Sequence, residues 1–233
     1  MALPKLETPT FKVKVPSTGK TIEYRPFLVK EEKLLLMMGE GTDQKQTSEI
    51  VAKLLESCIQ TKIDIKTLTT FDLEYIFLNL RAKSVGEDVS IMIGCEECNE
   101  KCPVDVNIET DVYIDYGGKK ISDIDFMVPI TDSVGVEMKF PTIDLLTDLK
   151  EDDSVGMIIK CMKSIYDKDT VHSVTDYTDA EVREFINSLS VRDVQKLQTF
   201  FDEMPKVKCK IKFTCPHCGH ENDFEIGGLS NFF

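Results

Sequence analysis

Two pairs of cysteines with Cys-x-x-Cys spacing carry the clearest site chemistry in this sequence. The first pair is Cys95 and Cys98, and the second is Cys215 and Cys218. Thiolates spaced in this way are typical zinc ligands, and four of them complete a tetrahedral shell. Two pairs therefore predict one structural Zn²⁺ per chain. A closed shell leaves no coordination position for water or substrate, so we expect the metal to stabilise the chain and not to catalyse.

Each pair lies in a predicted tight turn between two strands. Residues 91–93 and 104–108 flank the first pair, and residues 211–213 and 223–226 flank the second. The residue after the second cysteine is Asn99 or Gly219, and both types tolerate positive φ. Such a turn lets backbone N–H groups point at the sulfurs. The sequence thus predicts a four-cysteine zinc ribbon assembled from two distant segments.

Two neighbouring residues, Cys102 and His220, are close enough in sequence to replace one of the four ligands. When the two segments are aligned, Cys102 falls opposite Asn222, which is not a ligand type. This argues against Cys102, but both alternatives stay open at this level.

The other three cysteines are expected to be structural. Cys58 and Cys161 lie on apolar helical faces and are predicted to behave as small core residues. Cys209 aligns with Val89 in the first segment and is predicted to be a strand residue. Since no signal peptide is recognisable over Met1–Glu7, we expect the protein to act in a reducing cytoplasm or in a structure assembled there.

The elements that would position the cysteine pairs occur twice, in the same order. The first half has a predicted hairpin over 10–25, then helices over 29–38, 47–59 and 71–85. The second half has a strand over 126–130, then helices over 155–165, 182–189 and 194–204. Thr69 with Asp72, and Thr178 with Glu181, have the spacing of capping boxes at helix starts.

We therefore expect an α+β fold that is mostly helical, with short antiparallel hairpins, a zinc ribbon and an internal duplication. The predicted domains are residues 1–112 and 113–228, joined through the shared zinc, followed by a tail over 229–233. In that tail Leu229, Phe232 and Phe233 follow two glycines. We expect these three side chains to form an apolar anchor for a partner or a neighbouring subunit.

The charge balance points to proteins as partners. The chain has 28 Lys and Arg against 41 Asp and Glu, a formal net charge of −13. An acidic surface repels phosphate backbones and acidic membranes, so neither nucleic acid nor membrane binding is expected. No apolar run reaches the roughly 20 residues needed to span a bilayer. The alternating lysines of 206–212 are the one feature that favours nucleic acid, and carboxylates surround them in the sequence.

No catalytic constellation is recognisable. Gly19-Lys20-Thr21 resembles the end of a phosphate-binding loop, but it lies in a predicted hairpin and the required upstream glycine is absent. His172 has no partner that can be recognised in the sequence. We expect no enzymatic activity and no small-molecule substrate.

Two longer blocks carry a family resemblance. Residues 3–33, which include Tyr24-Arg25-Pro26-Phe27, and residues 70–87, which include Phe71-Asp72-Leu73-Glu74-Tyr75, resemble the baseplate hub proteins of T-even-type phages. Residues 110–152 offer little to match.

The resemblance implies a non-enzymatic component or assembly factor of the contractile-tail baseplate hub. Its partners would be other tail and baseplate proteins, and its location the virion baseplate or the host cytoplasm during assembly. Two alternatives remain: an assembly chaperone for the tape measure or hub that is absent from the mature virion, and a zinc-ribbon nucleic-acid adaptor.

Overall fold

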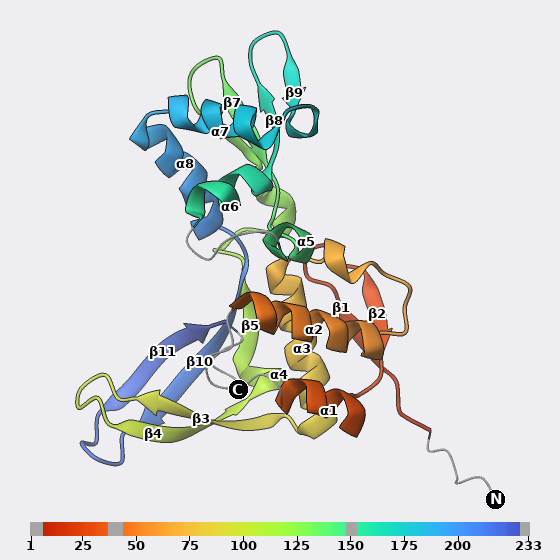
Figure 1. Ribbon diagram of the computed structural model, residues 1–233. Coiled ribbons are helices and arrows are strands. Elements are labelled where there is room, and N and C mark those ends of the chain that lie inside the picture. Colours follow the sequence, from red (N-terminus) through yellow and green to blue (C-terminus); the bar gives the residue numbers. More distant parts are fainter. Residues whose placement is uncertain (1–6, 37–43, 148–152, 229–233) are drawn as a thin grey trace, which may run out of the picture. The chain divides into compact units, whose positions relative to one another are not determined.

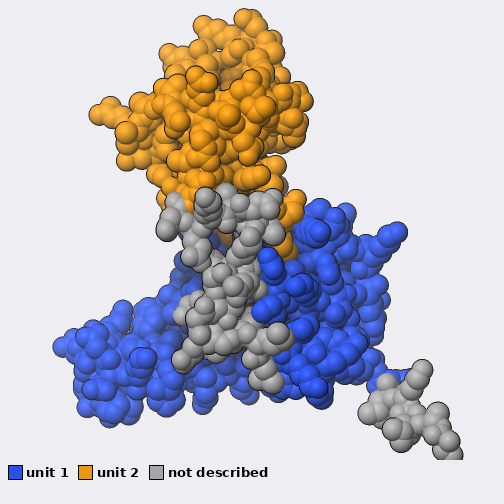
Figure 2. Space-filling model, viewed as in Figure 1, with its two compact units in different colours: residues 1–115, 206–233 blue, residues 116–205 orange. Residues whose placement is uncertain are grey.

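The computed structural model describes residues 7–36, 44–147 and 153–228. The chain forms two compact units, one of residues 1–115 with 206–233 and one of residues 116–205 (Figure 2). This division differs from the expected 1–112 and 113–228, because the last two strands belong with the first half of the chain. The predicted anchor of Leu229, Phe232 and Phe233 lies outside the described residues and stays a prediction.

Unit 1 is built around one buried helix, α3 (Thr70–Val85). Its capping box is confirmed: the Thr69 side chain accepts from the Asp72 N–H, and the Asp72 carboxylate accepts from the Thr69 N–H. Asp72 also accepts from the N–H and the hydroxyl of Ser17. The same carboxylate therefore caps α3 and holds the turn of the first hairpin.

The remaining elements of unit 1 include three antiparallel sheets (Figure 1). The β1–β2 and β3–β4 hairpins are separate two-stranded sheets, and β11, β10 and β5 form a three-stranded sheet in that order. The elements are β1 (Phe11–Lys14), β2 (Thr21–Tyr24), α1 (Val29–Leu36), α2 (Gln44–Cys58), η1 (Ile65–Thr67), β3 (Asp88–Gly94), β4 (Lys101–Asn107), α4 (Ile108–Asp111), β5 (Val112–Asp115), β10 (Lys206–Thr214) and β11 (Glu221–Gly227).

Unit 2 is a four-stranded antiparallel sheet, in the order β6-β7-β8-β9, accompanied by helices. Phe126, Phe140 and Phe200 pack ring against ring within it, with centroids 5.0–6.0 Å apart. The elements are η2 (Ile121–Asp123), β6 (Met127–Pro129), β7 (Gly135–Met138), α5 (Ile143–Thr147), α6 (Ser154–Cys161), β8 (Met162–Tyr166), β9 (Val171–Ser173), η3 (Val174–Asp176), α7 (Asp179–Ser188) and α8 (Val191–Asp202).

Two sequence expectations need correction. The chain is α+β as predicted, but it is not mostly helical, since the described residues hold eleven strands beside eight α-helices. The helix predicted over 155–165 ends at Cys161, and β8 follows directly. Met162 and Ser164 are buried while Lys163 is exposed, an alternation that belongs to a strand.

The β8–β9 hairpin has no counterpart among the described residues of the first half of the chain. The two halves share their opening hairpins and their ribbon hairpins, but not all the elements between them, so the duplication stays a prediction. Cys58 and Cys161 are fully buried, which confirms them as core residues. Among the described residues, no helix combines the length and the apolar character that a bilayer crossing requires.

Candidate metal centre

Two hairpins of unit 1 carry the cysteine pairs, and they lie side by side (Figure 1). In the first, β3 pairs with β4 from Asp88↔Asn107 to Gly94↔Lys101. In the second, β10 pairs with β11 from Lys208↔Gly227 to Thr214↔Glu221. Both cysteine pairs therefore occupy the turn of a hairpin, as the sequence predicted.

The four predicted ligands come together. The Sγ atoms of Cys95, Cys98, Cys215 and Cys218 all lie within 4.8 Å of one another. Cys95 and Cys218 are separated by 3.6 Å between sulfurs, and Cys98 and Cys215 by 3.7 Å. A tetrahedron with Zn–S bonds of about 2.3 Å has S–S edges of about 3.8 Å. The spacing and the donor type both fit a tetrahedral zinc, and the group within 4.8 Å does not include Cys102 or His220.

The two turns have the same backbone geometry. The N–H of Cys95 donates to the Glu100 carbonyl at 3.0 Å, and the N–H of Cys215 donates to the His220 carbonyl at 2.8 Å. Asn99 has φ 58° and Gly219 has φ 76°. The expected positive φ after the second cysteine is thus confirmed at both turns.

Backbone N–H groups assist ionisation of the first cysteine of each turn. At Cys95 the N–H groups of Cys98 and then Glu97 lower the thiol pKa. At Cys215 burial opposes ionisation, but the N–H groups of Cys218 and His217 and the neighbouring thiols outweigh it and lower the pKa to about 6. These two thiols are therefore prepared to bind a cation as thiolates.

Burial divides the cluster into an inner and an outer part. Cys95 and Cys215 are buried, Cys98 is partly exposed and Cys218 is exposed. Four thiolates close the shell of a tetrahedral ion, so a bound metal would crosslink the hairpins and would have no position for a substrate. The arrangement suits a structural site.

One contributor to this site, Asn222, was not assigned a role from the sequence. Its side chain is 2% exposed, its Oδ1 accepts from the Glu96 N–H at 3.0 Å, and its Nδ2 lies 3.6 Å from the Sγ of Cys95. It therefore ties the second hairpin to the first turn. In the sequence, Asn222 stands between Glu221 and Asp223, beside a predicted strand. This alternation could have indicated that its side chain is buried.

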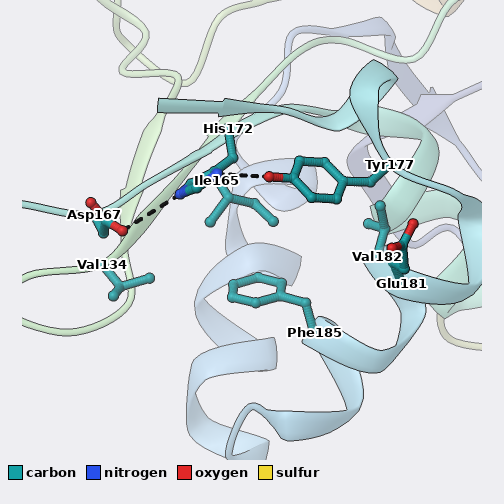
Figure 3. A pocket seen from close by; sticks show the side chains of 8 residues that line it. All are labelled: Val134, Ile165, Asp167, His172, Tyr177, Glu181, Val182 and Phe185. Carbon is teal, nitrogen blue, oxygen red and sulfur yellow. Dashed lines mark hydrogen bonds and ion pairs between the residues drawn. The ribbon is translucent and has the colours of Figure 1, made fainter. Parts of the chain in front are cut away.

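A second feature is a cavity of about 390 Å³ in unit 2 (Figure 3). His172, which has no recognisable partner in the sequence, has two in the structure. Its Nδ1 lies 2.8 Å from the Tyr177 hydroxyl, and its Nε2 lies 3.5 Å from a carboxylate oxygen of Asp167. The cavity is lined by Val134, Ile165, Asp167, His172, Tyr177, Glu181, Val182 and Phe185.

This cavity lacks the arrangement expected of a nucleophilic site. No serine, threonine or cysteine is among its lining residues, and both nitrogens of His172 face protein groups. General-base catalysis through histidine needs one ring nitrogen directed at a nucleophile. The lining residues of this cavity therefore do not form a histidine-activated nucleophile.

Comparison with known proteins adds one finding. A family model described as T4 bacteriophage base plate protein matches residues 8–233, a span that includes all four clustered cysteines. Neither a curated protein nor a solved structure matches the chain.

Proposed function

We propose that this chain, which belongs to the T4 bacteriophage base plate protein family, is a non-enzymatic component or assembly factor of the baseplate hub with a zinc-stabilised module for binding other tail proteins. Family membership supports a baseplate protein located in the virion tail. The assignment to the hub rests on the resemblance of residues 3–33 and 70–87 to hub proteins.

The cysteine cluster is the observation that carries the zinc part of the proposal. Four sulfurs lie within 4.8 Å of one another, and the two closest contacts between the hairpins among them, 3.6 and 3.7 Å, are close to the edge length of a Zn–S tetrahedron. All four are free cysteines, and a shared metal ion accounts for their convergence. Zinc would join the β3–β4 and β10–β11 hairpins, whose contacting cysteines are 117 and 123 residues apart in the chain. The entropic cost of closing a loop rises only logarithmically with its length. The binding free energy of a strong metal site can therefore offset it.

The charge supports proteins as partners and argues against nucleic acid. A formal net charge of −13 repels phosphate backbones. Two of the four lysines of β10 have acidic partners. Lys208 pairs with Asp115 and Glu225, and Lys212 pairs with Asp223.

Mass spectrometry of purified virions tests the proposal most directly. We expect peptides of this chain in wild-type particles, and incomplete baseplates when its gene is deleted. A chain that is absent from virions but required for baseplate formation would be the assembly chaperone instead. Normal, infective tails from the deletion would contradict both forms of the proposal.

The zinc is tested separately, on protein purified without chelators. Elemental analysis should find one zinc per chain. A deletion complemented with Cys215→Ser should give fewer complete baseplates than one complemented with Cys209→Val. Cys209 is equally buried in the same hairpin but lies outside the cluster, so its replacement is the matched control.

A further inference from the structure

The two ribbon hairpins can be aligned residue by residue, and the aligned residues make equivalent contacts. When 93–102 is aligned with 213–222, the Cys95–Cys218 sulfur contact of 3.6 Å becomes the Cys215–Cys98 contact of 3.7 Å. The N–H of Asn99 donates to the Cys95 carbonyl at 2.9 Å, and the N–H of Gly219 donates to the Cys215 carbonyl at the same distance. The ribbon therefore has a local twofold relation.

Cys102 and Asn222 occupy equivalent positions under this relation and make equivalent contacts. Asn222 Nδ2 lies 3.6 Å from Cys95 Sγ and 3.2 Å from the His220 carbonyl. Cys102 Sγ lies 3.7 Å from Cys215 Sγ and 3.6 Å from the Glu100 carbonyl. Each side chain thus reaches the first cysteine of the opposite turn and the carbonyl two residues before itself. Both are buried, at 1% and 2% exposure.

The difference in residue type follows from one further contact. Asn222 also accepts, through Oδ1, the N–H of Glu96 in the opposite turn. The residue equivalent to Glu96 is Pro216, which has no N–H to donate. Position 102 therefore needs a donor but no acceptor. A thiol supplies the donor, whereas an amide at this position would leave its oxygen without the corresponding partner.

We propose that Cys102 is a positioning residue that donates its S–H to the Cys215 thiolate, the role that Asn222 has toward Cys95, and that it is not a metal ligand. The inference rests on the proposed zinc. A metal-bound thiolate has no proton, so the hydrogen between these two sulfurs must come from Cys102. The thiol has one hydrogen, which is within reach of both the Cys215 sulfur and the Glu100 carbonyl. We assign it to Cys215, because a charged thiolate is a stronger acceptor than a neutral carbonyl. Four thiolates already fill a tetrahedral shell, and hydrogen bonds to ligating sulfurs orient them and balance their charge.

Zinc affinity of the full chain, measured by competition with a chromophoric chelator, tests the role of the thiol. Cys102→Val removes the donor and keeps an apolar side chain of similar size. We expect this variant to bind one zinc about 10- to 100-fold more weakly, the usual loss for a group that supports a ligand. Asn222→Val should show a loss of the same order, and Cys209→Val should show none.

A rescue experiment separates positioning from general packing. Cys102→Asn alone should bind zinc more weakly than wild type, because its oxygen faces Pro216. Cys102→Asn combined with Pro216→Glu should recover most of the lost affinity, because it copies the Asn222–Glu96 pair into the second turn. Such coupling between the two changes is not expected of two independent packing defects.

Cobalt distinguishes a supporting thiol from a ligand. With Co²⁺ in place of zinc, Cys102→Val should keep the four-thiolate absorption spectrum of the wild type. A spectrum with fewer thiolate ligands, or loss of metal from this variant, would make Cys102 a ligand and overturn the inference. If Cys102→Val binds zinc as tightly as the wild type, the positioning role of Cys102 is overturned but the zinc proposal is not. If the wild-type protein binds no metal, both proposals are overturned, so the two failures are distinguishable.

Discussion

Nη2 of Arg25 lies 2.8 Å from Oε1 of Glu31 in an ion pair that is almost completely enclosed. The same guanidinium donates to the Ser57 carbonyl at 2.8 Å, and Glu31 Oε2 accepts from the Leu28 N–H at 2.9 Å. The pair therefore connects the end of β2, the start of α1 and the end of α2. A buried pair with these hydrogen bonds is costly to break from one side, because replacing Glu31 leaves the mostly buried guanidinium of Arg25 without its counter-ion.

We expect Glu31→Gln to lower the free energy of unfolding at pH 7 by about 2–3 kcal/mol. Burial disfavours the Glu31 carboxylate, but Arg25 and the Leu28 N–H outweigh it and lower the pKa from its ordinary value of 4.5 to about 2. A lowered folded-state pKa gives stability that is complete above pH 4.5 and is lost as the pH falls toward 2.

Chemical denaturation of wild type and Glu31→Gln at pH 7, 5 and 3 checks this. The difference between the two proteins should shrink as the pH falls. Glu23→Gln is the matched control, since Glu23 pairs with Lys12 on the surface and its loss should cost less than about 0.5 kcal/mol. A difference that is unchanged at pH 3 would contradict the ionic role of the pair.

The carboxyl group of Glu74 on α3 should destabilise the protein above neutral pH. Burial raises its pKa to about 7, and no described residue pairs with it. A raised carboxyl pKa costs stability as the pH rises from 4.5 through 7. Glu74→Gln should therefore be about 1–3 kcal/mol more stable than wild type at pH 8 and nearly equal to it at pH 4.5. Glu56→Gln, at an exposed position of α2, should have no such pH dependence in thermal unfolding.

Removal of one clustered thiol should remove the metal. We expect Cys215→Ser to bind no stoichiometric zinc and to unfold at lower temperature with reduced cooperativity, because β3–β4 and β10–β11 lose their crosslink. At free zinc a thousandfold above the dissociation constant, the metal contributes about 4 kcal/mol. Elemental analysis and calorimetry with and without a chelator measure both effects. Zinc retained at wild-type occupancy, or identical unfolding of the two proteins, would show that the cluster is not the site.

No measurable DNA or RNA binding is expected at physiological salt. Three of the four lysines of β10 already have partners. Lys208 contacts two carboxylates, Lys212 pairs with Asp223, and Lys210 Nζ lies 5.2 Å from the ring centroid of Tyr113. Counterion release from phosphates needs cations that are free to contact them. Fluorescence anisotropy with labelled single- and double-stranded oligonucleotides provides the measurement. A salt-sensitive micromolar affinity that is lost in Lys210→Glu would favour the adaptor function instead.

Truncation after Gly228 tests the apolar tail. If Leu229, Phe232 and Phe233 anchor the chain to a partner, the truncated protein should keep its zinc and its thermal stability but bind baseplate partners more weakly. Burial of one such side chain contributes about 1.5–3 kcal/mol. Earlier unfolding of the truncated chain would mean that the tail packs on its own core.

Local chemistry allowed much of this protein to be predicted. The Cys-x-x-Cys spacing, the Asn99 and Gly219 turns and the capping boxes at Thr69 and Thr178 are properties of a few neighbouring residues, and the structure reproduces them. The helix over 155–165 was wrong because Ile158, Ile159, Met162 and Ile165 have helical spacing. Only the pairing of β8 with β7 and β9 decided that residues 162–166 are extended.

The sequence by itself thus determined the residue types of the cysteine cluster, their turns and the negative net charge, since each depends on residue identity and short spacing. Tertiary structure alone decided which distant groups meet: β10 with β5, Arg25 with the end of α2, and Asn222 with Glu96. It also left Cys102 outside the group of four sulfurs. Contacts between residues far apart in the chain depend on how whole elements pack, and no local pattern of residues encodes that packing.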